Sequence, residues 1–275
     1  SSSFSIRCLN PVDFPGFPKV AAEQQITIPF EDHTASGRYD EMLQDFHAYI
    51  LGEKENPFTY EHDYLVQKVL DEFQADSLRL YPDPAVSELT ECLAQYYGVE
   101  QNQVFVGVGS DDVIAMAFQT FFNSDQPILF PDITYSFYPV WADAFRIPYT
   151  TKPLDENFRM RREDYYGQNG GIIFPNPNAP TAVYENLEFV EDILKHNPEV
   201  LVIVDEAYID FGGTSARTLI DQYDNLLVIQ TFSKSRSMAG SRIGFAISNE
   251  KVIKYLNDVK YSFNSYTMDA LTIDL

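Results

Sequence analysis

The strongest indication of the fold comes from residues 226–242, Leu226-Leu-Val-Ile-Gln-Thr-Phe-Ser-Lys-Ser-Arg-Ser-Met-Ala-Gly-Ser-Arg242. This stretch begins with an apolar run typical of a buried strand, and Lys234 stands just after that run. A primary amine can form a Schiff base with an aldehyde, while Ser233 and Arg242 can hold a phosphate on the same molecule. These residues therefore predict a site that binds a phosphorylated aldehyde covalently at the carboxyl end of a strand.

Two further motifs lie upstream. Val202-Ile-Val-Asp-Glu-Ala-Tyr208 places an acid, Asp205, at the carboxyl end of another apolar run, and Phe174-Pro-Asn-Pro-Asn-Ala-Pro-Thr-Ala182 precedes it. Together with the lysine stretch, these motifs resemble the pyridoxal-phosphate aminotransferases of the aspartate-aminotransferase superfamily. The branch they resemble most is that of the histidinol-phosphate aminotransferases. The resemblance covers residues from about 75 to 275.

From residue 75 onward, strand-like and helix-like patterns alternate, which predicts an α/β fold with a mostly parallel sheet flanked by helices. Strands are expected at 104–106, 128–130, 172–174, 201–204, 226–229 and 243–246, and helices at 87–97, 110–122 and 185–194. In such sheets ligands bind at the carboxyl ends of strands, where all three motifs lie. The resemblance implies the large domain of a fold-type I aminotransferase, residues 75–275, truncated before the C-terminal small domain.

The first 74 residues predict a separate α+β segment. Apolar residues alternate with polar ones at 4–8 and 26–30, as in half-buried antiparallel strands, and helices are expected at 39–51 and 59–73. The wording from Gly37 to His62 resembles the closing segment of the glucose–fructose oxidoreductase family, which implies a piece of an NAD(P)-dependent oxidoreductase. A second interpretation aligns Glu55-Asn-Pro57 with a similar tripeptide near the start of the aminotransferases. A junction near residue 75 indicates a fusion, or a fragment with a foreign piece at its front.

Composition narrows the function classes. The chain has 275 residues, 45% of them hydrophobic, enough for one or two domains. Its net charge of −22 argues against a nucleic-acid partner, because phosphate-binding surfaces are basic. Only Cys8 and Cys92 are present, which gives no disulfide framework and no metal-ligand spacing and fits a reducing cytoplasm. No apolar run approaches the length of a membrane span.

The resemblance implies pyridoxal 5'-phosphate as the cofactor and three catalytic residues. Lys234 carries the cofactor and shuttles a proton during transfer. Asp205 lies beside the pyridine nitrogen, because a carboxylate favours its protonated form. Tyr208 donates a hydrogen bond to the ring hydroxyl. The reaction expected is amino transfer between histidinol phosphate and 2-oxoglutarate.

The remaining cofactor contacts follow from the same resemblance. Ser110 and Asp111 open a helix whose free N–H groups attract a phosphate. The segment before that helix resembles a dinucleotide loop, but Asp112 stands where the third glycine belongs. Tyr135 matches the aromatic residue that stacks on the pyridine ring. Tyr81 matches a tyrosine that reaches the phosphate of a neighbouring subunit, which implies a homodimer.

The sequence departs from the family pattern at two places, one that affects a hydrogen bond to the cofactor ring and one that affects substrate binding. Ala179 stands where the family has an asparagine that donates to the ring hydroxyl, which leaves that role to Tyr208, helped by Asn178 or a water. No arginine follows Arg242, although these enzymes hold the substrate with later arginines. The alternatives left open are a related phospho-amino-acid decarboxylase, an oxidoreductase remnant, and a chain that binds the cofactor without turnover.

Overall fold

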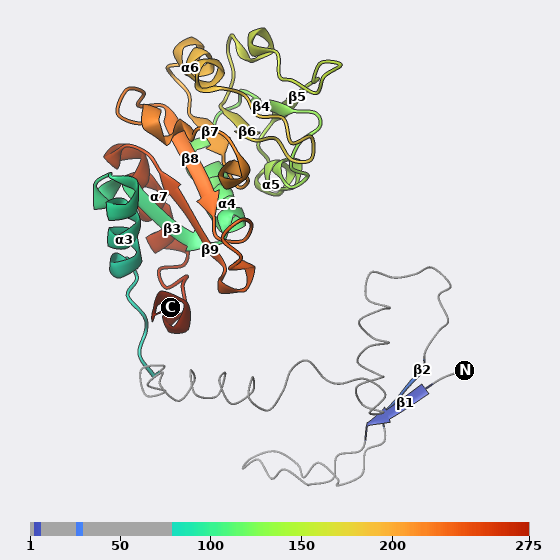
Figure 1. The fold of residues 1–275 in the computed structure, drawn as a ribbon, viewed down its shortest axis with the longest axis vertical. Helices are drawn as coiled ribbons and strands as arrows, with labels where there is room; N and C mark the ends of the chain where they lie inside the picture. Colours follow the sequence, from blue (N-terminus) through green and yellow to red (C-terminus); the bar gives the residue numbers. More distant parts are fainter. Residues whose placement is uncertain (1–2, 7–25, 30–78, 275) are drawn as a thin grey trace. The chain divides into compact units, whose positions relative to one another are not determined.

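The computed structural model describes residues 3–6, 26–29 and 79–274 (Figure 1). The chain divides into two units, Ser1–Val69 and Leu70–Leu275. The predicted boundary at residue 74 stays a prediction.

In the first unit, β1 (Ser3–Ile6) pairs with β2 (Ile26–Pro29) in antiparallel register, with Phe4 opposite Ile28. The alternation in the sequence predicted this pair. The two helices predicted at 39–51 and 59–73 lie outside the described residues.

A seven-stranded sheet forms the centre of the second unit (Figure 1). Across the sheet the strands are β3 (Val104–Val108), β9 (Ile243–Ile247), β8 (Leu226–Thr231), β7 (Val202–Asp205), β6 (Ile172–Pro175), β4 (Ile128–Pro131) and β5 (Tyr149–Lys152). β9 is antiparallel to both of its neighbours, and all other pairings are parallel. Sequence patterning predicted every strand except β5, an edge strand whose residues are polar or partly exposed.

Helices cover both faces of this sheet. The apolar side chains of α3 (Ser87–Tyr97) and α6 (Leu187–His196) join the core on one face. Those of α4 (Ser110–Phe121), α5 (Tyr138–Phe145) and α7 (Glu250–Phe263) join the core on the other. The remaining short elements are η2 (Gln101–Gln103), η3 (Arg162–Tyr165), η4 (Ile209–Phe211), η5 (Ala216–Leu219), η6 (Ala239–Ser241) and α8 (Ala270–Asp274).

The two covered faces explain why the strands are continuous apolar runs. Val202 and Val204 of β7 contribute to the α3/α6 core, whereas Ile203 between them contributes to the α4/α5/α7 core. Successive side chains of a strand point to opposite faces, so a strand buried on both sides needs apolar residues at every position.

The last turn of α3 buries one of its two neighbouring tyrosines. Tyr97 is buried in the core, whereas Tyr96 is 80% exposed. The Tyr97 hydroxyl donates to Gln230 Oε1 at 2.7 Å, so its polar atom is satisfied inside the core. The helix ends as predicted at Gly98, which has a positive φ of 66° and donates its N–H to the last turn.

Most of the predicted site residues lie along the border of the sheet that is formed by strand ends. β3, β4, β6, β7 and β8 end there, and β9 begins there because it runs the opposite way; we call this the carboxyl edge. Gly244 in β9 lets the start of α4 approach, since an added Cβ would overlap the backbone of Gly109 and Ser110. The close approach brings Arg242, just before β9, to the first turn of α4.

Candidate active site

Asp205, the last residue of β7, is the buried acid of the carboxyl edge. Its side chain is only 4% exposed, and its Oδ1 accepts a hydrogen bond from the Ala207 N–H at 3.2 Å. Its pKa is raised to about 6, mainly by burial, with a smaller rise from the Asp111 charge; the hydrogen bonds from Tyr138 and the Ala207 N–H and the Lys234 ammonium oppose this rise. A buried carboxylate of this kind is stabilised by any cation that enters beside it.

Tyr138, the first residue of α5, is a site residue that the sequence analysis missed. It is fully buried, and its hydroxyl donates to Asp205 Oδ2 at 2.8 Å across 67 positions of sequence. Its pKa lies well above the ordinary tyrosine value, because burial and the neighbouring carboxylate both disfavour the phenolate. No sequence signal separates Tyr138 from the other aromatic residues of its segment, since its partner is distant in the chain.

Lys234 and Tyr208 face each other across the carboxyl edge. The Lys234 Nζ lies 5.2 Å from the centroid of the Tyr208 ring. Lys234 is exposed, Tyr208 is partly buried, and the ammonium charge is close enough to lower the pKa of Asp205. The three predicted catalytic residues therefore lie together in the fold.

The first turn of α4 and Arg242 form a cradle for an anion. Arg242 Nη2 lies 3.9 Å from Asp111 Oδ2, and Nη1 donates to Ser233 Oγ at 3.4 Å. Gly109 caps the helix without a side chain, and a Cβ there would overlap the Arg242 guanidinium. Since the first N–H groups of a helix have no partner within it, those of Ser110 and Asp111 can point at an anion that Arg242 also binds.

Tyr135 contacts both the anion cradle and the ring of Tyr138, the partner of Asp205. Its hydroxyl donates to Asp111 Oδ1 at 2.9 Å, and its ring lies 5.6 Å from the Tyr138 ring, nearly perpendicular to it. Burial and the hydrogen bond to Asp111 raise its pKa, and the charge of Asp205 contributes to the rise. The structure thus places Tyr135 between the two carboxylates, as an aromatic wall of the site.

Asn178 cannot replace the donor that Ala179 lacks. Its two Nδ2 hydrogens are taken by the Ile133 carbonyl oxygen and by Thr181 Oγ1, both at 2.9 Å. Only its Oδ1 is left, buried and without a partner, and that atom is an acceptor. Among the side chains described around the ring position, Tyr208 is the hydroxyl donor beside Lys234.

Tyr81 lies apart from this group. It is 80% exposed, and its ring stacks on that of Tyr266 with centroids 4.4 Å apart. Its contact is therefore with the C-terminal segment of the same chain. The implied contact with a neighbouring subunit stays a prediction.

The residues fit pyridoxal 5'-phosphate. The glycine at position 109 leaves open the space that a Cβ would fill, beside a guanidinium and a helix start suited to a phosphate. Among residues 79–274, no cationic side chain forms an ion pair with the buried Asp205 carboxylate, and a protonated pyridine nitrogen would supply such a partner. Lys234 supplies the primary amine between these two points.

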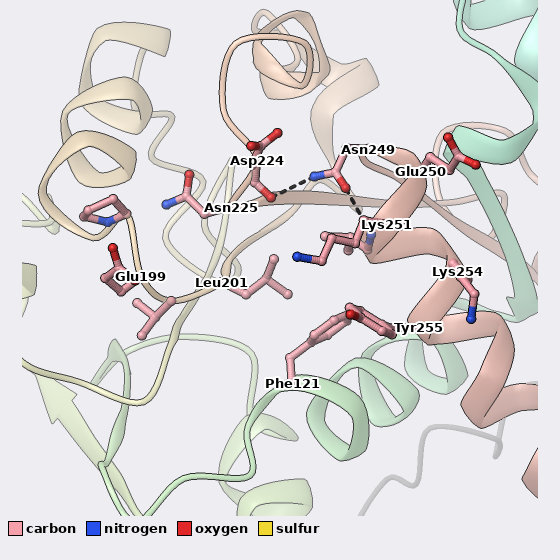
Figure 2. A pocket seen from close by; sticks show the side chains of 13 residues that line it. Phe121, Glu199, Leu201, Asp224, Asn225, Asn249, Glu250, Lys251, Lys254 and Tyr255 are labelled. Atoms are coloured by element: carbon pink, nitrogen blue, oxygen red, sulfur yellow. Dashed lines mark hydrogen bonds between the residues drawn. The ribbon is translucent and has the colours of Figure 1, made fainter.

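Other features of the described residues offer no competing site. Residues 79–274 contain no group of three His, Cys, Asp or Glu side chains arranged to hold a metal ion, and none of their helices could span a bilayer. A cavity of about 690 Å³ lies at the opposite edge of the sheet, where β7 and β8 begin. Figure 2 shows its lining, in which Lys251 lies above the rings of Phe121 and Tyr255 and the Asn249 amide donates to the Asp224 carbonyl oxygen. This mixed and open surface is remote from Lys234.

Comparison with known proteins places this geometry in context. A family model for aminotransferase class I and II matches residues 49–272. Histidinol-phosphate aminotransferase 1 of Hydrogenovibrio crunogenus is 53% identical over 221 residues, 80% of this chain and 62% of that protein. Histidinol-phosphate aminotransferase of Pseudomonas syringae pv. syringae is 56% identical over 196 residues, 71% of this chain and 56% of that protein. The chain thus spans about three fifths of the length of these relatives.

A solved structure shows the same fold. Histidinol-phosphate aminotransferase from Sinorhizobium meliloti, crystallised with pyridoxal-5'-phosphate, superposes with a TM-score of 0.68 at 20% identity, covering 76% of this chain and 58% of that one. The fold is therefore fold-type I, as the resemblance implied. The family match also includes residues 49–74, where it favours the aminotransferase-like interpretation over the oxidoreductase-like one.

Proposed function

Since the chain belongs to the aminotransferase class I and II family, we propose that it binds pyridoxal 5'-phosphate on Lys234 and transfers an amino group to a 2-oxo acid. The proposal rests on one observation, that three functional groups lie close together at the carboxyl edge. These are the Lys234 amine, the buried Asp205 carboxylate and the anion cradle of Arg242 and α4. When bound, the cofactor supplies a ring that withdraws electrons from the carbon losing its proton.

Asp205 fixes the protonation of the pyridine nitrogen. The carboxylate is buried, and Tyr138 and the Ala207 N–H hold its two oxygens in place. A positive pyridine N–H beside it would lower the pKa of Asp205 from about 6 and keep the acid ionised. The same attraction keeps the nitrogen protonated.

Lys234 and Tyr208 are the residues that would hold and move protons beside the bound cofactor. The Lys234 amine would accept a proton from the substrate and return it. The Tyr208 ring lies 5.2 Å from that amine, and its hydroxyl would donate a hydrogen bond to the oxygen on the cofactor ring and so lower the basicity of that oxygen.

The proposed substrates are histidinol phosphate and 2-oxoglutarate. Support comes from relatives of that name that are 53% and 56% identical to this chain. We propose further that the whole protein is a cytoplasmic homodimer, with the exposed Tyr81 at the contact between copies.

The cofactor proposal is tested by absorbance. Purified chain mixed with pyridoxal 5'-phosphate should develop a visible absorption band, and Lys234→Ala should not. Lys254→Ala is the matched control, because Lys254 is an exposed lysine on α7 whose partner is Asp258. If wild type shows no band, or if Lys234→Ala keeps it, the proposal is wrong.

The substrate proposal needs a separate assay. With histidinol phosphate as amino donor, the protein should convert 2-oxoglutarate to glutamate, and one glutamate should form for each histidinol phosphate consumed. Release of carbon dioxide from a phosphorylated amino acid instead would favour the decarboxylase alternative.

A further inference from the structure

A buried polar network lies on the face of the sheet opposite to Asp205. Glu206 is 1% exposed and accepts hydrogen bonds from Ser215 Oγ and the Ala216 N–H, both at 2.6 Å, and from Gln230 Nε2 at 2.9 Å. Because side chains alternate beyond the end of β7, Asp205 and Glu206 point to opposite faces. Glu206 therefore faces away from the proposed cofactor, and the mechanism above makes no use of it.

Arg236 continues this network across the carboxyl edge. Its Nε lies 3.0 Å from Asp210 Oδ2, and its Nη2 donates to Asp210 Oδ1 at 3.2 Å. The same Nη2 donates to Gln230 Oε1 and to Tyr97 Oη, each at 2.8 Å. The guanidinium also lies over the ring of Phe232 at 5.1 Å. Since Nη2 carries two hydrogens, one of them is shared between two of these three acceptors.

The members of the network flank two proposed site residues. Glu206 and Asp210 stand two positions before and two positions after Tyr208, and Gln230 and Arg236 stand before and after Lys234. The Glu206–Gln230 hydrogen bond joins the segments that follow β7 and β8, the two loops, at the point where they leave the sheet. The Asp210–Arg236 pair ties them again further out. Lys234 Nζ lies 5.2 Å from the Tyr208 ring between these two ties.

We propose that these four residues form a clamp that sets the separation of Lys234 and Tyr208, with Arg236 as its principal positioning residue. Arg236 lies on the loop after β8 and contacts both Asp210 on the loop after β7 and Gln230 near the end of β8. The proposal rests on the proposed function. Its consequence is that Arg236, which does not itself touch the cofactor position, controls the hydrogen bond between Tyr208 and the ring oxygen.

The test compares Arg236→Gln with Arg217→Gln. Arg217 is a matched control, because it donates to the Tyr97 carbonyl oxygen at 2.8 Å and lies 5.2 Å from the Tyr97 ring, but it does not join the two loops. In each protein loaded with pyridoxal 5'-phosphate, the visible band is titrated with pH. A donor to the ring oxygen lowers the basicity of the lysine–cofactor unit, so loosening it raises the apparent pKa.

The clamp predicts a rise of about 0.5 to 1 pH unit in Arg236→Gln and no change in Arg217→Gln. Arg236→Lys keeps the positive charge but loses the planar guanidinium with its several donors. Its apparent pKa should therefore rise less than that of Arg236→Gln. An unchanged pKa in Arg236→Gln, or an equal shift in Arg217→Gln, would overturn the proposal. If Arg236→Gln does not fold, Asp210→Asn perturbs the same pair from its more exposed side.

A second readout separates this proposal from the proposed function. Hydrogen exchange of residues 206–211 and 232–238 is measured in the cofactor-free chain. Arg236→Gln should accelerate exchange in both loops by at least about tenfold, whereas Arg217→Gln should leave them unchanged. Failure of the proposed function would remove the visible band from wild type and leave this exchange result standing. Acceleration in one loop alone would refute the clamp.

Discussion

Replacing Tyr138 with phenylalanine isolates one hydrogen bond of the candidate site. The change removes a single hydroxyl from a fully buried ring and leaves the packing of α5 in place. That hydroxyl donates to Asp205 Oδ2 at 2.8 Å, and the other oxygen of Asp205 keeps only the longer bond from the Ala207 N–H. The variant should therefore weaken the folded state in proportion to the charge on Asp205.

The size of the effect follows from the pKa of Asp205. A hydrogen bond to a charged group contributes about 1.5–3 kcal/mol, and one to a neutral group about 0.5–1.5 kcal/mol. The pKa of Asp205 is raised to about 6 by burial, so the group is ionised at pH 8 and mostly protonated at pH 5. Tyr138→Phe should lower the free energy of unfolding by about 2 kcal/mol at pH 8 and by about 1 kcal/mol at pH 5.

Urea unfolding of the cofactor-free chain at the two pH values measures this difference. Tyr165→Phe is the matched control, because Tyr165 is 1% exposed and its hydroxyl has no hydrogen-bond partner. Removing that hydroxyl should leave stability unchanged or slightly higher at both pH values. An equal loss at pH 5 and pH 8, or a comparable loss in Tyr165→Phe, would refute the assignment of Tyr138 to Asp205.

Three further predictions concern the cradle and the buried acids. Gly244→Ala should destabilise the chain by at least about 2 kcal/mol in denaturant unfolding, because its Cβ would overlap the backbone at the start of α4, whereas Gly240→Ala meets nothing within 4 Å and should not. Arg242→Gln should weaken binding of pyridoxal 5'-phosphate in equilibrium titrations by about 10- to 100-fold, while binding of pyridoxal without its phosphate stays unchanged. Burial raises the pKa of Asp205 to about 6 and that of Glu206 to about 7, both above their unfolded values. Their stabilising contribution is therefore present below pH 4 and is lost as pH rises through 6 and 7, by roughly 3 kcal/mol each at most. Unfolding of the cofactor-free chain between pH 5 and pH 8 should show this fall, and a smaller fall in Asp205→Asn; a rise over that range would contradict it.

The strands and the acid–lysine pair were predictable because local patterns determine them. β7 and β8 read as continuous apolar runs since both of their faces are covered, and their ends in the sequence fix where Asp205 and Lys234 emerge. The antiparallel direction of β9 was not predicted, although it is what brings Arg242 to the same edge. Parallel and antiparallel strands buried on both faces carry the same apolar pattern.

The supporting contacts were not predictable because they join distant segments. Tyr138 meets Asp205 across 67 positions, and Arg236 meets Tyr97 across 139. Composition and period show that such residues are aromatic or charged, but not which partner each one finds in the fold. Local motifs accordingly predict roles for Arg242 and Tyr208 but give no signal for Arg236 and Glu206.

In the proposed function, Lys234 is the amine that holds the cofactor beside Asp205. Treating the chain with pyridoxal 5'-phosphate, reducing it with borohydride and mapping the peptides by mass spectrometry locates that amine directly. We expect one stable pyridoxyl group, on the peptide containing Lys234, at stoichiometric cofactor. Labelling spread over exposed lysines, or confined to a lysine other than Lys234, would contradict it.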